Sequence, residues 1–347
     1  MQKIDFVYGN EKRFDDFIKL TKDAKKIALI SHVDLDGLGS AMVVNDVVKL
    51  DLIKFVDYKD LNHGLVDELK NNGITHVIIT DLYLKGEETY REIEKFAEIL
   101  VIDHHMSPDY SSDRNYFINA SEKGFCTTYM CYLLFSRITN LEKFDWLVAC
   151  ASLSDICYKT NVEWMKEVYE KYGEDFNVND IKNSKFWDVS WKISLALIYL
   201  KDDIQKVFDL MSDEFNADNL EKYYLPVEQE FQELKKRFEK DKVEIYDGYF
   251  WEIGAKYGVK SLMSNWLSLD KYPDKIVIIG KISYGLYTLS YRRQDGKYDM
   301  NNLIRKMIEG FENSTGGGHF KAAGGHIQLK DSEEFKKRLK NLKDYLE

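Results

Sequence analysis

Three continuous apolar segments, each followed at once by an acidic residue or loop, constrain the fold of this chain most strongly. Residues 26–31 precede a Gly-bearing acidic loop, residues 75–80 precede Asp81, and residues 97–102 precede Asp103. A helical pattern follows the first segment, and helical segments separate the others. Continuous apolar strands that alternate with helices are typical of a parallel sheet covered on both faces. We therefore predict an α/β fold built on a parallel sheet.

The length of the chain predicts more than one domain, because 347 residues exceed the usual size of a single hydrophobic core. After the apolar helices that follow the sheet comes a stretch rich in Lys, Glu and Asp at helical spacing, and then short strands and helices return. We predict a parallel-sheet catalytic domain at residues 1–160, a helical connector at 161–240, and a smaller α/β substrate-binding domain at 241–347. A cleft is expected between the two α/β domains.

Histidine and aspartate residues gather at the ends of the predicted strands. In the sequence SHVDLDGLGS, His32, Asp34 and Asp36 occupy alternate positions, so an extended backbone would turn them toward one face. A solvated acidic turn, with an aspartate capping the next helix, is the alternative. Asp81 and Asp103 follow two further strands, however, and ligands bind at the carboxyl ends of strands in open α/β sheets. The convergence of three acidic strand ends favours a metal site.

The residue types of this cluster suit hard divalent cations. His104 and His105 follow Asp103 directly, and Asp155 closes an apolar helical stretch. Carboxylates mixed with imidazoles suit Mn²⁺, Mg²⁺ or Co²⁺ better than a thiolate-preferring ion. The number of candidate ligands exceeds what one octahedral ion needs, so two ions are implied. Paired ions can clamp a phosphoryl oxygen and activate a water for in-line displacement.

Taken together, these motifs resemble those of the DHH/DHHA1 phosphoesterases. The resemblance rests on HxDxDG at residues 32–37, the strand-end Asp81, the DHH triplet at 103–105, the later helical Asp155, and GGGH at 316–319 with a following AAGG. The SHVDLDGLGSA form of the first motif is most similar to the branch of the oligoribonuclease NrnB and cyclic-nucleotide phosphodiesterase-like proteins. The motifs reach from about residue 26 to 160 and from about 243 to 330. The resemblance implies a metal-dependent phosphoesterase.

Roles for the metal ligands also follow from this resemblance. Asp34 would bind one ion and Asp36 the other, Asp81 would bridge them, and His104 with Asp155 would complete the second site. Two Mn²⁺ ions are expected, with Mg²⁺ or Co²⁺ as alternatives.

Three further residues lie beside these ligands in the sequence. In related families the first histidine stands where this chain has Ile30, so His32 would be either a ligand or a substrate contact. Asp103 would be a ligand or would orient one, and His105 would face the substrate phosphate or the leaving group. We take Asp103 and His105 as the candidate catalytic residues.

The glycine-rich segment STGGGHFKAAGGH is the predicted substrate side. Successive glycines in a loop expose backbone N–H groups that can cradle a phosphate. Arg292 ends the predicted strand LYTLSYR and could hold the same phosphate; Arg293 is the alternative, because adjacent strand residues face opposite sides. The predicted substrate-binding residues are Arg292, Gly316, Gly317, Gly318 and His319.

The charge of the chain limits its partners. A net charge of −10 and a pI near 5.4 argue against a protein that coats long nucleic acid, which gains affinity from an extended basic surface. The sequence has no apolar signal core and no stretch of about 18 apolar residues, so we expect no membrane partner and a cytoplasmic location. The expected substrates are short RNA oligonucleotides or small nucleotides.

Other functions remain open at this point. A phosphodiesterase for cyclic mono- or dinucleotides and a phosphatase for 3′-phosphoadenosine 5′-phosphate would use the same chemistry. An inactive nucleotide sensor is an alternative from another class, but its expected loss of metal ligands is not seen. The sequence leaves open the physiological substrate, the cleavage direction, the native metal and the oligomeric state. The helical connector could shape the cleft or form a homodimer.

Overall fold

A parallel sheet lies at the centre of the first of two units. The computed structural model describes residues 3–82, 87–121 and 123–346, and the chain divides into the units Met1–Tyr224 and Leu225–Glu347. The strands of the first sheet are β1 (Ile27–His32), β2 (Leu52–Val56), β3 (His76–Thr80), β4 (Glu98–Asp103) and β5 (Asn115–Asn119). They lie in the order β2-β1-β3-β4-β5, and all neighbours are parallel. The predicted parallel α/β fold is confirmed, with β2 and β5 as additional strands.

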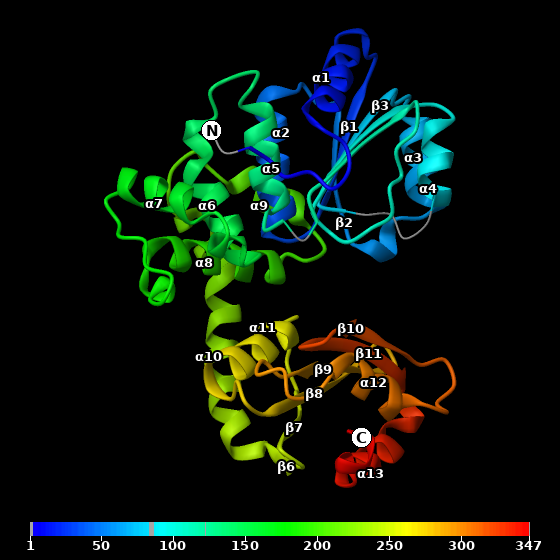
Figure 1. The fold of residues 1–347 in the computed structure, drawn as a ribbon, viewed down its shortest axis with the longest axis vertical. Coiled ribbons are helices and arrows are strands. Elements are labelled where there is room, and N and C mark those ends of the chain that lie inside the picture. Colours follow the sequence, from blue (N-terminus) through cyan, green and yellow to red (C-terminus); the bar gives the residue numbers. More distant parts are fainter. Residues whose placement is uncertain (1–2, 83–86, 122, 347) are drawn as a thin grey trace. The chain divides into compact units, whose positions relative to one another are not determined.

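Helices cover both faces of this sheet (Figure 1). They are α1 (Glu11–Leu20), α2 (Leu35–Val47), α3 (His63–Asn71), α4 (Glu87–Glu94) and α5 (Thr127–Phe135). Alternate residues of β1 point to different apolar clusters. Leu29 packs with residues of α1, α2 and α5, whereas Ile30 packs with residues of α3 and α4. The carboxyl edge of the sheet is thus fixed by a core on each side.

More helices follow the sheet, the first of them before the region predicted to hold the connector and the others mainly within it. They are α6 (Asp145–Ser154), α7 (Val162–Lys171), α8 (Lys185–Tyr199), α9 (Ile204–Leu210) and α10 (Glu221–Asp241). The helices from α6 to α9 belong to the first unit, where α6 packs against α8. The chain passes into the second unit within α10, at Leu225. The division into three parts stays a prediction.

A mixed sheet forms the second unit. Its strands are β6 (Val243–Ile245), β7 (Gly248–Glu252), β8 (Ile276–Ser283), β9 (Leu286–Arg292), β10 (Thr315–His319) and β11 (Ala322–Gln328), in the order β10-β11-β9-β8-β7-β6. Its helices are α11 (Lys260–Asn265), α12 (Met300–Ile308) and α13 (Ser332–Lys340). Side chains of α12 and α13 form an apolar core against one face of the sheet, and α11 packs on β8 and β9.

The glycine-rich segment is a β-hairpin and not the loop that we predicted. β10 pairs with β11 in antiparallel register, from Thr315 opposite His326 to His319 opposite Ala322. Glycine has a low strand propensity, which favoured the loop interpretation, but here it permits close packing. A Cβ on Gly316 would lie 2.8 Å from Ile308 Cδ1 in α12. Because β10 is an edge strand, part of its backbone donors lie outside the ladder.

None of the helices in the described part of the chain combines the length and the apolar composition that crossing a bilayer requires.

Candidate metal centre and substrate side

The first motif lies at the junction of β1 and α2. His32 ends β1, and Asp34 is the N-cap of α2, where its Oδ1 accepts a 3.0 Å hydrogen bond from Gly37 N. Asp34 therefore caps this helix, as the alternative interpretation of the motif supposed. The capping hydrogen bond uses only its Oδ1. Asp34 Oδ2 lies 2.9 Å from His32 Nδ1. A Cβ on Gly37 would lie 2.2 Å from His32 O, so this tight turn requires glycine.

Asp36 lies in the first turn of α2 and is fully buried. Its two carboxylate oxygens accept 2.7 Å hydrogen bonds from Thr127 N and Thr128 N at the start of α5. Backbone donors of this kind stabilise a buried negative charge. Asp36 Oδ2 also lies 3.7 Å from His104 Nε2. Sequence reasoning missed both threonines, which are far from Asp36 in the chain.

Asp81 follows β3 and lies between His32 and the pair of histidines His104 and His105. Its Oδ2 lies 3.4 Å from His32 Nδ1, and its Oδ1 lies 3.4 Å from His104 Nε2 and 3.8 Å from His105 Nδ1. The backbone φ of Asp81 is 59°, in the left-handed region that is uncommon for residues other than glycine, asparagine and aspartate. Such conformations cluster at active sites and ligand clamps.

The two histidines that follow β4 make different contacts. His104 Nε2 lies 3.2 Å from Oδ2 of Asp155, the C-cap of α6. His105 Nδ1 lies 2.8 Å from Asp103 Oδ1, and His105 N donates to Asp103 Oδ2 at 3.1 Å. Asn119, at the end of β5, donates to His105 O at 2.9 Å. Of the two roles left open for Asp103, this geometry favours orienting His105. Asn119 was not predicted, because β5 was not recognised.

All eight side chains predicted from the first domain are therefore brought to one edge of the sheet. The ligand atoms of seven of them, all but Asp103, form three overlapping groups, each with all atoms within 4.8 Å of one another. The groups are His32, Asp34 and Asp81; Asp36, His104 and Asp155; and Asp81, His104 and His105. Asp81 and His104 each belong to two groups, so the geometry offers adjacent positions for two ions.

Buried polar atoms support ion binding at these positions. Among the described residues, His32 Nδ1, Asp81 Oδ2 and His104 Nε2 are buried and have no hydrogen-bond partner of acceptable geometry. Such atoms are costly unless something binds them. Carboxylate oxygens and imidazole nitrogens are donors that Mn²⁺ accepts. The residues present thus fit two divalent ions, and their individual roles as ligands stay a prediction.

Burial and neighbouring charges shift the pKa values of this cluster. Burial, followed by the negative charge of Asp36, raises the pKa of Asp155 to about 6. Burial, with Asp36 and Asp34, raises the pKa of Asp81 well above its usual range. Burial disfavours the charged His32 imidazole, but the adjacent carboxylates of Asp34 and Asp81 outweigh it and raise its pKa to about 11. The cluster therefore holds protons that a bound cation would displace.

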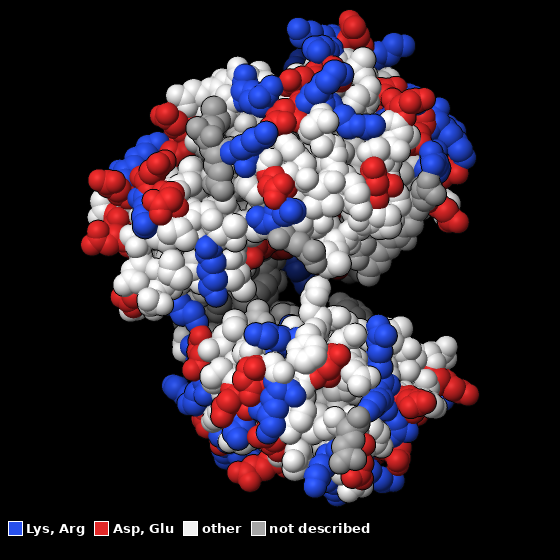
Figure 2. All heavy atoms as spheres, viewed as in Figure 1, with Lys and Arg blue, Asp and Glu red and all other residues white. Residues whose placement is uncertain are grey.

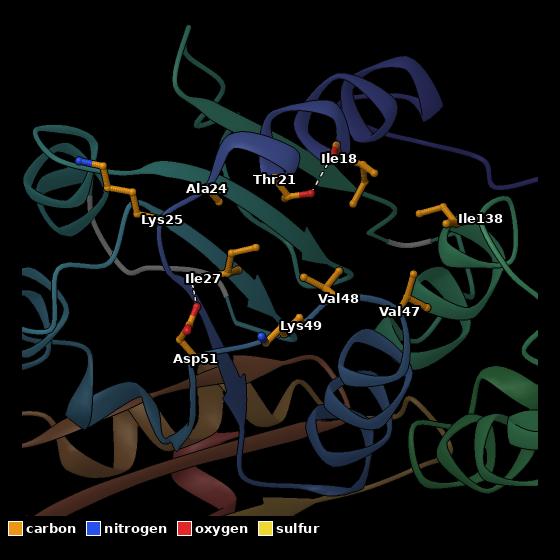
Figure 3. Close-up of a pocket in the computed structure, with 10 residues that line it drawn as sticks. All are labelled: Ile18, Thr21, Ala24, Lys25, Ile27, Val47, Val48, Lys49, Asp51 and Ile138. Carbon is orange, nitrogen blue, oxygen red and sulfur yellow. Dashed lines mark hydrogen bonds between the residues drawn. The ribbon is translucent and has the colours of Figure 1, made fainter.

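A separate cavity of about 360 Å³ lies at the opposite end of the strands (Figure 3). It is lined by Ile27, at the start of β1, and by Lys25, Lys49 and Asp51 among others. Asp51 Oδ2 accepts a 2.9 Å hydrogen bond from Ile27 N, which gives this carboxylate a structural role. None of the predicted site residues lines this cavity.

In the second unit, two adjacent arginines have different environments. Arg293 is buried, with ion pairs of 3.0 Å to Asp247 and 2.7 Å to Asp295. Arg292 donates to two backbone carbonyl oxygens, and the described residues give it no carboxylate partner. Burial lowers the pKa of the Arg292 guanidinium. Of the two arginines, Arg292 is therefore the one suited to an external anion, and its role in substrate binding stays a prediction.

The sheet register brings Arg292 near the other predicted substrate-binding residues. Ala322 in β11 pairs with both His319 in β10 and Arg292 in β9. Residues that pair directly lie on the same face of a sheet, so His319 and Arg292 share a face. Gly316, Gly317 and Gly318 precede His319 in the same strand. Their role in binding a phosphate stays a prediction.

We expect Arg292→Gln and Arg293→Gln to have different effects. Arg293→Gln leaves Asp247 and Asp295 without their buried partner and should lower the free energy of unfolding of the second unit by about 2–3 kcal/mol. Arg292→Gln should leave that stability unchanged and weaken binding of a phosphate-bearing ligand roughly 10-fold. Thermal denaturation and ligand titration measure the two effects. Equal loss of stability in both variants would contradict this assignment.

Two family models match the chain. The DHH family, N-terminal domain, matches residues 26–154, and the DHHA1 domain matches residues 259–347. A comparison with curated proteins gives no match.

Several solved structures share the fold at low sequence identity. RecJ in complex with Mn²⁺ from Thermus thermophilus has a TM-score of 0.66 at 15% sequence identity. The match covers 95% of this chain and 54% of RecJ, so this chain spans about half the length of that protein. The pGpG-specific phosphodiesterase PggH from Vibrio cholerae has a TM-score of 0.54 at 14% identity, over 92% of this chain and 99% of PggH. An exopolyphosphatase-related protein from Bacteroides fragilis has a TM-score of 0.51 at 16% identity, over 98% of both chains.

Proposed function

The chain belongs to the DHH/DHHA1 phosphoesterase superfamily, and from this premise we propose that it uses two divalent ions to hydrolyse short oligoribonucleotides or small nucleotides. The observation that carries the proposal is the pair of ligand groups at the carboxyl edge of the first sheet, which lie next to each other around Asp81. Members of this superfamily are metal-dependent phosphoesterases or nucleases.

The two groups would each hold one ion. His32, Asp34 and Asp81 would provide one position, and Asp36, His104 and Asp155 the other. Ions bound there would polarise a phosphoryl oxygen and lower the pKa of a water molecule. Mn²⁺ is the proposed ion and Mg²⁺ an alternative, since structures of RecJ with each ion share this fold.

His105 is the proposed proton-transfer residue. Asp103 lies 2.8 Å from Nδ1 of the imidazole and so favours a hydrogen on that atom. When the ring carries a hydrogen on both nitrogens, Nε2 is the atom that can give a proton to the leaving oxygen of the substrate. Asn119 and the backbone of His105 hold the same carboxylate, which fixes the ring orientation. Asp103 thus acts by positioning His105.

We expect Asp103→Asn to lower kcat by about 10²-fold or more, because the amide supports the wrong tautomer of His105. Both Mn²⁺ ions should still bind, since Asp103 is in none of the three ligand groups. Single-turnover kinetics and Mn²⁺ titration distinguish the two effects, and Asp109→Asn, at an exposed position nearby, is the matched control. A loss of Mn²⁺ binding in Asp103→Asn would show that Asp103 is itself a ligand.

We propose small substrates because the surface carries a mixture of positive and negative charges. On the face drawn in Figure 2, basic and acidic side chains are interspersed over each unit. The net charge of −10 also opposes long nucleic acid. Arg292 and His319 would instead bind one phosphate of a short ligand.

A linear or cyclic dinucleotide is the second candidate substrate. The observation that favours it is the fold shared with the pGpG-specific phosphodiesterase PggH, which this chain covers almost completely. Hydrolysis of 3′-phosphoadenosine 5′-phosphate would require the same two ions and the same proton donor.

Hydrolysis of a substrate panel tests this proposal. The panel holds an RNA ladder from di- to pentanucleotide, pGpG, cyclic dinucleotides and 3′-phosphoadenosine 5′-phosphate, each with and without Mn²⁺. Stepwise shortening of the ladder that requires Mn²⁺ would support the oligoribonuclease function, and turnover of one other compound alone would define a narrower substrate. An absence of Mn²⁺-dependent turnover across the panel would contradict the proposal and favour a nucleotide sensor.

A further inference from the structure

Ile156 has a backbone conformation that isoleucine rarely adopts. Its φ of 62° and ψ of 14° lie in the left-handed region, where the backbone crowds a β-branched side chain. Among the described residues, the other non-glycine positions with such a φ carry no β-branched side chain; they are Asp81, Asp247, Tyr284 and Asn313. An outlier of this kind costs free energy, and such outliers cluster at active sites.

The helix end at this point does not require an isoleucine. Ile156 follows Asp155, the C-cap of α6, and its N donates to Leu153 O at 3.2 Å. In this common helix C-terminal motif the left-handed residue is usually glycine, and the apolar contact that accompanies the motif comes from the residue after it. Here that residue is Cys157, which is buried. Capping of α6 therefore does not explain the side chain of Ile156.

Packing does not explain the isoleucine either. Ile156 is 49% exposed, and it is not among the described residues that form the apolar cores of the first unit. An apolar side chain that stays in water contributes little of the free energy that burial would provide. The position thus combines a strained backbone with an exposed apolar side chain, and folding gains from neither.

The candidate metal centre lies directly beside this residue. Ile156 follows Asp155, whose Oδ2 lies 3.2 Å from His104 Nε2. Met106 follows His105 in the same way, and it is also apolar and 63% exposed. Exposed apolar side chains therefore come directly after a proposed metal ligand and after the proposed proton-transfer residue.

We propose that Ile156 contacts the nucleoside part of the substrate, and that this contact makes the enzyme prefer nucleotides to phosphoesters that carry no base. The inference rests on the proposed function and adds a specificity-determining residue to it. Two bound ions would act on a phosphoryl group, which is the same in both classes of substrate. An apolar side chain gains free energy only by covering the face of a base or the carbon atoms of a ribose. The strained backbone would hold Ile156 where it can do so.

A cycle that changes both the side chain and the base tests this proposal. The value of kcat/KM with Mn²⁺ is measured for pApA and for two analogues, one without the base of the 5′ nucleoside and one without that of the 3′ nucleoside. We expect Ile156→Asn to lower kcat/KM for pApA roughly 10-fold and to leave it unchanged for one of the two analogues. That analogue identifies the nucleoside that Ile156 contacts. An equal loss for all three compounds would overturn the proposal.

Thermal stability distinguishes this role from a structural one. Asparagine tolerates the left-handed conformation, so Ile156→Asn should raise the midpoint of thermal unfolding by about 2–4 °C while it lowers kcat/KM. Ile156→Leu keeps an apolar side chain without the branch at Cβ, and it should retain most of the kcat/KM for pApA. A less stable Ile156→Asn with equal losses for all three compounds would show that the residue serves folding alone.

Ile138→Asn is the matched control. Ile138 is 48% exposed, and it lines the cavity at the opposite end of the strands from the metal centre. Its replacement should leave kcat/KM for pApA and for both analogues unchanged. A loss for pApA in this variant as large as that in Ile156→Asn would contradict a specific contact at Ile156.

Failure of this inference is distinguishable from failure of the proposed function. If wild type hydrolyses pApA with Mn²⁺ and Ile156→Asn has the same kcat/KM, the phosphoesterase function stands and the role of Ile156 is wrong. If wild type hydrolyses none of the three compounds, calorimetric titration with Mn²⁺ replaces the kinetics. Tighter binding of pApA than of one analogue, lost in Ile156→Asn, would then support the contact in a protein that is not an enzyme. Equal binding of the three compounds, or none, would overturn it.

Discussion

Replacing Asp81 with asparagine is expected to lower kcat by at least about 10³-fold and to abolish binding of one Mn²⁺ ion. Asp81 is shared by two ligand groups, with its two oxygens near His32 on one side and His104 on the other. An amide there cannot provide the negative charge that the paired ions require. Loss of several kcal/mol of stabilisation of the transition state corresponds to this decrease in rate. Steady-state kinetics and Mn²⁺ titration measure the two effects.

Asparagine is chosen because it preserves the backbone conformation at residue 81. Asparagine tolerates the left-handed φ of 59° at this position, whereas alanine would be strained there. The high pKa of Asp81, caused by burial and by Asp36 and Asp34, also makes the neutral amide a good substitute for the protonated acid. The thermal stability of the metal-free variant should therefore equal that of wild type. Asp175→Asn, at an exposed position, is the control, and retention of full activity by Asp81→Asn would exclude the bridging role.

Removal of metal at pH 7.5 is expected to lower the midpoint of thermal unfolding of the first unit by roughly 10–20 °C. Each ion at about 100 times its Kd contributes about 2.7 kcal/mol to the folded state. In a unit of this size, each kcal/mol of unfolding free energy changes the midpoint of thermal unfolding by about 2–4 °C. Differential scanning calorimetry with Mn²⁺ or with a chelator measures the shift. The second unit has no part in these ligand groups, so its transition should not move.

The metal effect should be smaller at pH 5. Burial and the charge of Asp36 raise the pKa of Asp155 from its ordinary 3.8 to about 6, so between these values the metal-free folded state binds a proton that the unfolded state lacks. The stability of the metal-free protein therefore falls as pH rises through this window. Bound Mn²⁺ displaces that proton, so the stabilisation by Mn²⁺ should increase by at least about 1.4 kcal/mol from pH 5 to pH 7.5. The opposite trend would show that Asp155 is not a ligand.

Sequence reasoning identified the candidate metal centre because its residues lie at strand ends. In a parallel sheet, all carboxyl ends meet at one edge, so Asp81 and Asp103 could be placed beside His32 without knowledge of any contact. The alternation of His32, Asp34 and Asp36 was less informative. Asp34 and Asp36 lie in the capping position and first turn of a helix, not in an extended strand, and they reach the cluster through that turn.

Contacts between distant segments could not be predicted in the same way. The amides of Thr127 and Thr128 hold Asp36 from more than 90 residues away, and no local pattern marks them. The strand β5 was missed because its five residues, NYFIN, carry asparagine at both ends, and the positioning role of Asn119 was missed with it. The glycine-rich hairpin was predicted as a loop because its pairing depends on β9 and α12 and not on its own composition.

Anomalous diffraction from crystals grown with Mn²⁺ tests the central claim most directly. The account predicts two manganese peaks at the carboxyl edge of the first sheet, one bound by His32, Asp34 and Asp81 and the other by Asp36, His104 and Asp155. In crystals of Asp81→Asn, one of the two peaks should disappear. A single peak in wild type, or none among these residues at millimolar Mn²⁺, would contradict a mechanism that depends on two ions.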